Sequence, residues 1–137
     1  MKRPKHPARV THGSASYKRG GRAEWAALVY LMCKGYFPCA MRYRAAQSKT
    51  RAGEIDIIVQ RGNIIAAIEV KARPNVVIGH EAMNEREWRR RHAAMAHFIR
   101  RLYRNGRGKN YTIRFDLVIV TPYFQIRHLK SAWQPAF

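Results

Sequence analysis

Residues 53–73 read GEIDIIVQRGNIIAAIEVKAR, and this stretch decides the fold. Two runs rich in Ile and Val, residues 54–61 and 64–73, are typical of neighbouring β-strands. Gly62-Asn63 lies between them and predicts a two-residue turn of type II′, because glycine takes the positive φ of the first turn position without strain. Pro74 ends the second run. The stretch therefore predicts a β-hairpin.

The turn sets which residues of the hairpin face each other. With Arg61 opposite Ile64, counting back along both strands places Asp56 opposite Glu69. Opposed Cβ atoms in a sheet lie about 4.5–5.5 Å apart, which is close enough for two carboxylates to bind one cation. Two acids at this separation repel each other, so the pair predicts a metal ion or a lysine beside them.

Side chains alternate between the two faces of a strand, so Glu69 and Lys71 are expected on one face with Asp56. Carboxylate oxygens suit Mg²⁺ or Mn²⁺, and a lysine beside such a metal can activate water or stabilise charge on a phosphate. The alternative is a solvated strand face with a cross-strand Glu–Lys pair. The opposite face is expected to be apolar, with Ile55, Ile57, Val59, Ile64, Ile68 and Val70.

A helix is predicted over residues 21–34, because Ala27, Leu28 and Leu31 fall on one stripe at spacings of three and four. Glu24 lies on the same stripe. A carboxylate that faces a core is costly unless it is paired or binds metal. Glu24 is therefore either a site residue or a first-turn glutamate that favours the helix dipole.

The rest of the chain predicts one domain over residues 17–137, preceded by a flexible basic arm over residues 1–16. The arm is either a DNA-contacting segment or a disordered tail. The other predicted elements are an edge strand over 36–44, a basic loop over 45–53, a helix over 81–105, a strand over 114–121 and a stretch over 126–133 that pairs and then turns briefly helical.

The charge narrows the class of partner. Lys and Arg total 27 against 8 Asp and Glu, which gives a formal net charge of +19. A chain that repels itself this strongly is expected to bind nucleic acid, an anionic membrane surface or an acidic protein. Arg predominates, and its planar fork suits phosphate. Since no apolar run is long enough for a membrane span and no secretory signal precedes the domain, we expect a cytoplasmic protein without a membrane partner.

The long predicted helix is the candidate phosphate-binding surface, with a solvated helix face as the alternative. Its arginines are Arg86, Arg89, Arg90, Arg91, Arg100, Arg101 and Arg104. Asp116 lies inside an apolar strand and is expected to make structural hydrogen bonds. Ordinary packing is expected for Tyr43, Trp88 and Tyr123. Cys33 and Cys39 are expected to be partly buried thiols, with a disulfide or metal pair as the alternative.

Four motifs resemble the YraN-like family of bacterial proteins over roughly residues 18–133. They are GRAEWAA (21–27), GEIDII (53–58), IEVKAR (68–73) and RFDLV (114–118). The resemblance implies a restriction-endonuclease-like fold, which is shared with archaeal Holliday junction resolvases and other PD-(D/E)XK nucleases. This is an α/β fold with an αβββαβ core, in which helices flank a mixed sheet.

The resemblance also implies roles for particular residues. It carries Asp56, Glu69 and Lys71 onto the nuclease motif and Glu24 onto the helix-borne acid of some relatives. Asp56, Glu69 and the carbonyl of Val70 would then bind Mg²⁺ or Mn²⁺, Lys71 would position or activate the attacking water, and Glu24 would be an auxiliary ligand. Resolvase-like relatives act as dimers, which makes a second copy of the chain a candidate partner.

The chain departs from the family pattern at several positions. Ile55 stands where the motif name has Pro, Arg42 stands where the family usually has Asn, and Arg86-Glu87 stand where relatives often carry Lys. The residues expected to bind metal match the family motif, whereas these departures put the family's substrate contacts in doubt for this chain. We predict nucleic-acid contacts at Arg42, Arg44, Lys49, Arg51, Arg73, Arg86 and Arg90.

Three functional hypotheses follow from the sequence. The first is a metal-dependent endonuclease that hydrolyses phosphodiesters of branched or single-stranded DNA. The second is a non-catalytic DNA- or RNA-binding module that retains the nuclease fold. The third is a basic adaptor for an acidic protein. Metal dependence and cleavage distinguish the first from the second, and tight binding of DNA counts against the third.

Overall fold

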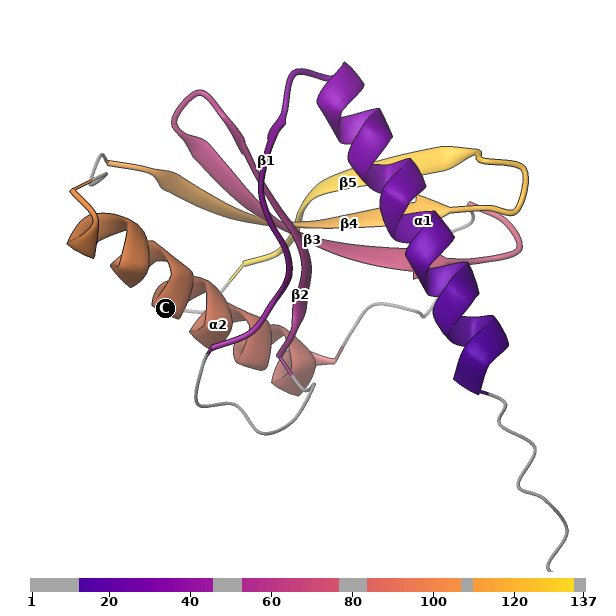
Figure 1. Cartoon of the computed structure of the whole chain (residues 1–137), viewed down its shortest axis with the longest axis horizontal. Coiled ribbons are helices and arrows are strands. Elements are labelled where there is room, and N and C mark those ends of the chain that lie inside the picture. Colours follow the sequence, from indigo (N-terminus) through magenta and orange to yellow (C-terminus); the bar gives the residue numbers. More distant parts are fainter. Residues whose placement is uncertain (1–12, 46–52, 77–83, 107–109, 135–137) are drawn as a thin grey trace, which may run out of the picture.

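The computed structural model describes residues 13–45, 53–76, 84–106 and 110–134. They form a five-stranded sheet of order β1-β2-β3-β4-β5 with a helix packed on each face (Figure 1). The elements are α1 (Gly13–Cys33), β1 (Phe37–Tyr43), β2 (Ile55–Arg61), β3 (Ile64–Ala72), α2 (Glu85–Arg104), β4 (Thr112–Val120) and β5 (Ile126–Trp133). This mixed sheet with two helices confirms the predicted α/β class and the αβββαβ order of a restriction-endonuclease-like core.

The β2–β3 hairpin has the predicted turn and register. Arg61 pairs with Ile64, and Ile57 pairs with Ile68. Gly62 has a φ of 60° and Asn63 has no positive φ, as a type II′ turn requires. β3 then pairs with β4 in parallel, whereas the other neighbouring strands are antiparallel. A parallel pair needs a crossover connection, and α2 provides it.

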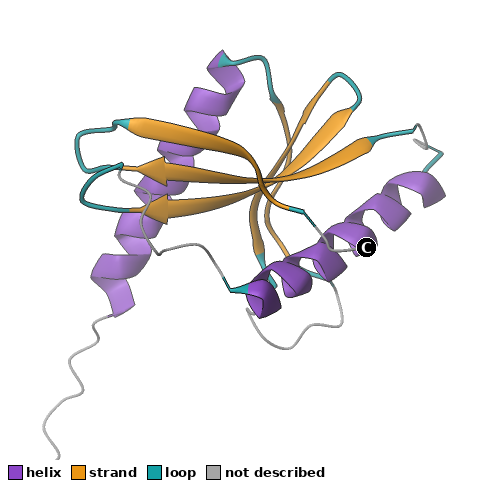
Figure 2. Ribbon diagram, turned by 180° about the vertical axis from the view of Figure 1, so that it is seen from behind, coloured by secondary structure: helices purple, strands orange, loops and turns teal. Residues whose placement is uncertain are grey.

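The sheet is buried on both faces, which corrects the prediction of one apolar and one polar face for the hairpin. Ile57 and Ile68 pack under α1, whereas Ile58 and Ile65 pack under α2. Ile55 also belongs to the α2 side, although it was expected beside Ile57. The view from behind shows α1 beyond the strands (Figure 2). The cause is the position of β2 and β3 inside the sheet, where both faces meet a helix.

Helix boundaries differ from the predictions at the N-terminal ends. α1 begins at Gly13, so it includes the last four residues of the predicted arm. Residues 1–12 lie outside the described residues. α2 begins at Glu85 rather than at residue 81, because Asn84 is an extended N-cap whose side chain accepts from the backbone N–H of Glu87 at 2.9 Å. Residues 81–83 also lie outside the described part of the chain.

The outer strands agree with the predictions in part. Pro38 lies on the edge strand β1, as expected for a residue that cannot donate to the ladder. β5 remains a strand through Trp133, so the brief helical turn expected there is wrong up to that residue. Ser131 has a φ of 53°. Within the described ranges, neither helix is long and apolar enough to cross a membrane.

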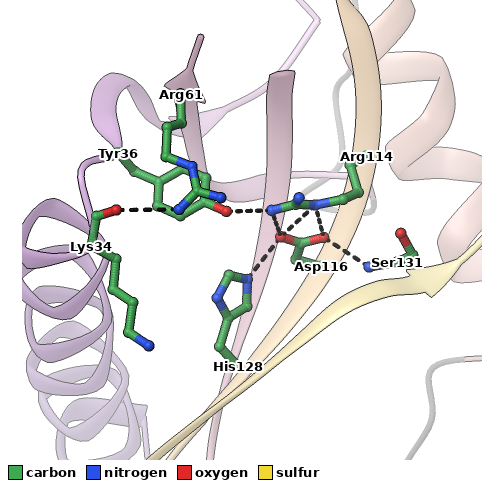
Figure 3. Close-up of polar contacts among 7 residues, drawn as sticks. All are labelled: Lys34, Tyr36, Arg61, Arg114, Asp116, His128 and Ser131. Atoms are coloured by element: carbon green, nitrogen blue, oxygen red, sulfur yellow. Dashed lines mark hydrogen bonds and ion pairs between the residues drawn. The ribbon is translucent and has the colours of Figure 1, made fainter. Parts of the chain in front are cut away.

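A buried ionic network ties β4 and β5 to the end of α1 (Figure 3). Asp116 is fully buried and accepts from Arg114 at 2.8 Å, from His128 at 2.8 Å and from the backbone N–H of Ser131 at 3.0 Å. Arg114 also donates to the hydroxyl of Tyr36 at 2.6 Å. Burial alone would raise the pKa of Asp116, but the hydrogen bonds from His128, Arg114 and Ser131 lower it below its ordinary value. The predicted structural role of Asp116 is confirmed.

We expect Asp116→Ala to lower the free energy of unfolding by roughly 3–5 kcal/mol, because it leaves the largely buried Arg114 guanidinium and the buried His128 without their carboxylate partner. Urea denaturation measures this change. Glu85→Gln is the control, since Glu85 is an exposed carboxylate paired with Arg89, and we expect it to change stability by about 1 kcal/mol or less. A loss of that small size in Asp116→Ala would contradict the network's role.

Candidate functional site

Two carboxylates meet in the middle of the sheet, where β2 and β3 run side by side. The antiparallel pairing of β2 with β3 ends at Ile57 and Ile68, and Asp56 and Glu69 are the next residues along the two strands. Their side chains are in hydrogen-bond contact. Asp56 is mostly buried and its Oδ2 accepts from the backbone N–H of Val70 at 2.8 Å. Glu69 is buried. The side chain of Asp56 thus lies between its own strand and β3.

The environment of Asp56 favours its protonated form. The pKa of Asp56 is raised to about 8, with burial as the largest cause and the charge of Glu69 as the second. A hydrogen bond to Glu69 and the charge of Glu24 contribute to this rise, and the hydrogen bond from Val70 opposes it. Among the described residues, no Lys, Arg or His forms an ion pair with Asp56. Within the described ranges, the cations of the site pair with Glu69 and Glu24, and Asp56 has no cation of its own.

Glu69 is held by two cations from different elements. Arg91 of α2 donates to both oxygens of Glu69, from Nε at 2.9 Å and from Nη2 at 3.3 Å. Nζ of Lys71 lies 3.2 Å from Oε1 of the same carboxylate. Glu69 and Lys71 are therefore on one face, as predicted, and that face is the one covered by α2.

Arg91 is the site residue that the sequence analysis missed. It was grouped with the phosphate-binding arginines of α2, yet its side chain is 17% exposed and points to the sheet. A signal for this was present, because Arg91 lies three residues after Trp88 and four before Met95, on the stripe of α2 that is buried. An arginine on a buried stripe requires a carboxylate partner.

Glu24 of α1 reaches the same region from the other side of the sheet. Its carboxylate accepts from Nε of Arg42 at 3.0 Å. Arg42 lies between Met41, which pairs with Ile57, and Tyr43, so it stands across from Asp56 on β1. Arg42 also has a positive φ of 50°. The structure therefore brings Glu24, Asp56, Glu69 and Lys71 into one neighbourhood.

The donor set at Asp56 and Glu69 fits a hard divalent cation. No group of three or more His, Cys, Asp or Glu side chains in the described ranges is arranged to hold a metal ion. Mg²⁺ does not require such a group, because it is commonly bound through one or two carboxylates with the remaining positions filled by water and substrate phosphate. A cation here would also relieve the repulsion that raises the pKa of Asp56.

The predicted nucleic-acid contacts are spread over several surfaces. Arg86 and Arg90 are exposed on α2. Arg44 lies at the end of β1, 3.7 Å from a carboxylate oxygen of Glu54. Arg73 follows β3 and donates to the carbonyl of Ala72 at 2.9 Å. Arg42 belongs to the pair with Glu24 described above. Lys49 and Arg51 lie outside the described residues.

The aromatic residues and cysteines considered in the sequence analysis lie outside the carboxylate site. Tyr43 and Trp88 are buried in the α2 side of the core, as expected. Tyr123 is exposed instead of packed. Cys33 and Cys39 are free and exposed, so the prediction of partly buried thiols is wrong and no disulfide joins them. Their helix-end and edge-strand positions explain this, because neither element is covered there.

Comparisons with known proteins give a family. The model of the uncharacterised protein family UPF0102 matches residues 23–120, a span that includes every carboxylate of the site. A relative from Parvibaculum lavamentivorans is 41% identical over 126 residues, which cover 90% of this chain and 86% of the relative. A relative from Rhizobium meliloti is 43% identical over 116 residues, with coverage of 85% and 88%. A relative from Methylorubrum extorquens is 41% identical over 137 residues, with coverage of 98% and 97%. All three are named as UPF0102 proteins.

The raised pKa of Asp56 predicts a pH-dependent stability. A raised pKa in the folded state contributes stability that is full below the unfolded value of about 4 and is lost as pH rises through about 8. Asp56→Asn keeps a neutral side chain at all pH values. In buffer with EDTA, we expect the stability of Asp56→Asn relative to the unsubstituted protein to increase by roughly 2–5 kcal/mol from pH 4 to pH 9. Urea denaturation at both pH values checks this, and a difference independent of pH would contradict the raised pKa of Asp56.

Proposed function

This chain belongs to the UPF0102 family, which is the YraN-like family, and we propose that it is a nucleic-acid-binding, metal-dependent endonuclease that hydrolyses DNA phosphodiester bonds. One observation carries the proposal. Asp56 is a largely buried carboxylate beside a second carboxylate, Glu69, and its pKa is raised to about 8 in a chain of net charge +19. Such a site favours a cation, and such a chain favours a polyanion.

Asp56, Glu69 and the carbonyl of Val70 would hold Mg²⁺ or Mn²⁺. A divalent cation bound there would lower the pKa of a bound water and neutralise charge that develops on the phosphate. The backbone N–H of Val70 fixes the rotamer of Asp56 through its 2.8 Å hydrogen bond. Arg91 fixes the orientation of Glu69, because its two donors engage both carboxylate oxygens.

Lys71 would act directly on the reacting groups. Its Nζ lies 3.2 Å from Glu69 and its side chain is 26% exposed, so the ammonium adjoins the carboxylates and still reaches solvent. In that position it would orient the attacking water or stabilise the charged phosphorane-like transition state. Glu24 is the proposed auxiliary ligand, and Arg42 sets the position of its carboxylate.

One observation favours the second candidate function, a non-catalytic nucleic-acid-binding module. Arg91 and Lys71 already neutralise Glu69 without a metal ion. In such a module, the carboxylates would serve the fold and the positive surface would serve binding. The two functions differ in their response to divalent metal, which the following experiments measure.

Cleavage tests the endonuclease. Purified protein with Mn²⁺ is incubated with branched, flapped and linear DNA, and the rate of strand cleavage is measured. We expect Asp56→Asn to reduce the rate by on the order of 100-fold or more, because it removes a metal ligand. Glu85→Gln is the matched control, since it removes a carboxylate from the exposed start of α2, and it should cleave normally. Cleavage by Asp56→Asn at the unsubstituted rate would refute the assignment.

Metal binding is tested without any substrate. We expect Mn²⁺ or Mg²⁺ to stabilise the folded protein by about 2.7 kcal/mol at a metal concentration 100 times the Kd, since the ion binds only the folded state. Thermal unfolding with and without metal measures this. Asp56→Asn should lose the stabilisation, whereas Lys130→Ala, a surface lysine variant, should keep it. The non-catalytic module predicts no metal-dependent stabilisation in any of the three proteins.

A further inference from the structure

α2 also lines a pocket rich in arginine, which is separate from the Asp56–Glu69 pair. It is a pocket of about 510 Å³ between α2, the end of β1 and the start of β2. These elements lie side by side in Figure 1. Its lining residues are Arg44, Ala45, Gly53, Arg90, Ala93, Ala94, His97, Arg100, Arg101 and Arg104. The volume is within the range of pockets that bind small ligands or single groups of a larger ligand, about 300–1,000 Å³.

The pocket concentrates positive charge without acidic neighbours on the helix. Half of its ten lining residues are arginines, and none is an acid. Arg44 is paired with Glu54, which lies outside the lining, at 3.7 Å. The acidic residues of α2 are Glu85 and Glu87, both in the first turn, so the helix is free of acids from Trp88 to Arg104. Guanidinium groups gathered in this way repel one another. An anion in the pocket would remove that repulsion.

The walls of the pocket are set by small residues and by a fixed backbone contact. Ala93 and Ala94 leave space beside the helix. Gly53 has a φ of 89°, and a Cβ there would lie 3.1 Å from the carbonyl oxygen of Arg90. The backbone before β2 therefore rests directly against α2, a close approach that glycine permits.

One further polar group in the pocket has a fixed orientation. His97 lines the pocket, and its Nδ1 lies 2.6 Å from the hydroxyl of Tyr43. Tyr43 is buried and packs edge-on against Phe98, which holds the hydroxyl in place. This contact leaves Nε2 as the ring nitrogen that can meet a ligand.

We propose that this pocket binds a phosphate group of a nucleic-acid strand. The proposal rests on the proposed function in one respect, which is that the ligand is nucleic acid. Several guanidinium forks that line one open pocket match the oxygens of a phosphate, because each fork can donate two parallel hydrogen bonds. A chain of carboxylates is the competing anion, and the experiment below separates the two.

The position of the pocket relates it to the candidate catalytic site. Arg90 lines the pocket, while the next residue, Arg91, bonds to Glu69. Gly53 precedes Asp56 by three residues, which corresponds to on the order of 10 Å along a strand. A strand anchored by one phosphate in the pocket can therefore present a nearby phosphodiester to Asp56 and Glu69.

The experiment is equilibrium binding to the full-length chain in EDTA, measured by fluorescence anisotropy over a range of salt concentrations. The probes are single-stranded DNA oligonucleotides with a 5′-phosphate or a 5′-hydroxyl. The test variant is Arg90→Gln/Arg101→Gln. The matched control is Arg127→Gln/Lys130→Gln, which removes the same charge from exposed positions of β5. Circular dichroism verifies that both variants are folded.

We expect the pocket variant to bind either probe at least 10-fold more weakly and to lose about 1.4 from the slope of log affinity against log salt, the value for two phosphate contacts to a single strand. The control should change affinity less than about 2-fold, since it loses only long-range attraction. If the unsubstituted protein prefers the 5′-phosphate probe and the pocket variant does not, the pocket binds the phosphate at a strand end. Equal binding of both probes assigns it to an internal phosphodiester.

Two results would overturn the proposal. The first is a pocket variant that binds as well as the control. The second is competition by poly-glutamate as strong as that by an oligonucleotide of equal length, which would mean that the pocket selects charge and not phosphate. EDTA removes cleavage from the measurement. A chain that never cleaves DNA can thus still confirm the pocket, and a chain that cleaves can still refute it.

Discussion

The burial of Asp56 beside Glu69 is the constraint around which the rest of the structure is arranged. Both residues lie on inner strands of a sheet that helices cover on each face, so neither carboxylate is freely hydrated. Burying two like charges together is unfavourable. α2 supplies Arg91 against Glu69, and the backbone of Val70 donates to Asp56. No described cation pairs with Asp56, and its pKa is raised, mainly by burial.

Asp116 is a buried acid whose charge is compensated by its neighbours, in contrast to Asp56. It is as deeply buried as any residue of the core, yet Arg114, His128 and a backbone N–H surround it, and its pKa is lowered. The network in Figure 3 therefore behaves as a complete structural element. The fold can thus neutralise a buried carboxylate fully. Its failure to do so at Asp56 distinguishes a candidate reactive site from a structural one.

The predictable parts of this structure depend on local pattern. The Gly62-Asn63 turn fixed the register of β2 and β3 from Arg61 and Ile64 to Ile57 and Ile68, because a hairpin's geometry depends on its turn. That register brings the next residues, Asp56 and Glu69, close together. The pairing of Arg91 with Glu69 depends on how α2 lies across the sheet, and a single sequence does not specify that docking. The burial of both sheet faces was missed for the same reason, since it depends on where each helix packs.

α2 contributes to both the carboxylate site and the arginine pocket. Successive residues of a helix point about 100° apart, so Arg90 and Arg91 serve different surfaces although they adjoin in sequence. Arg91 points to the sheet and orients a carboxylate, while Arg90 lines the arginine pocket. A shift of the helix would move both groups together. The helix thus holds Arg91 against Glu69 and presents Arg90 to the pocket from one rigid backbone.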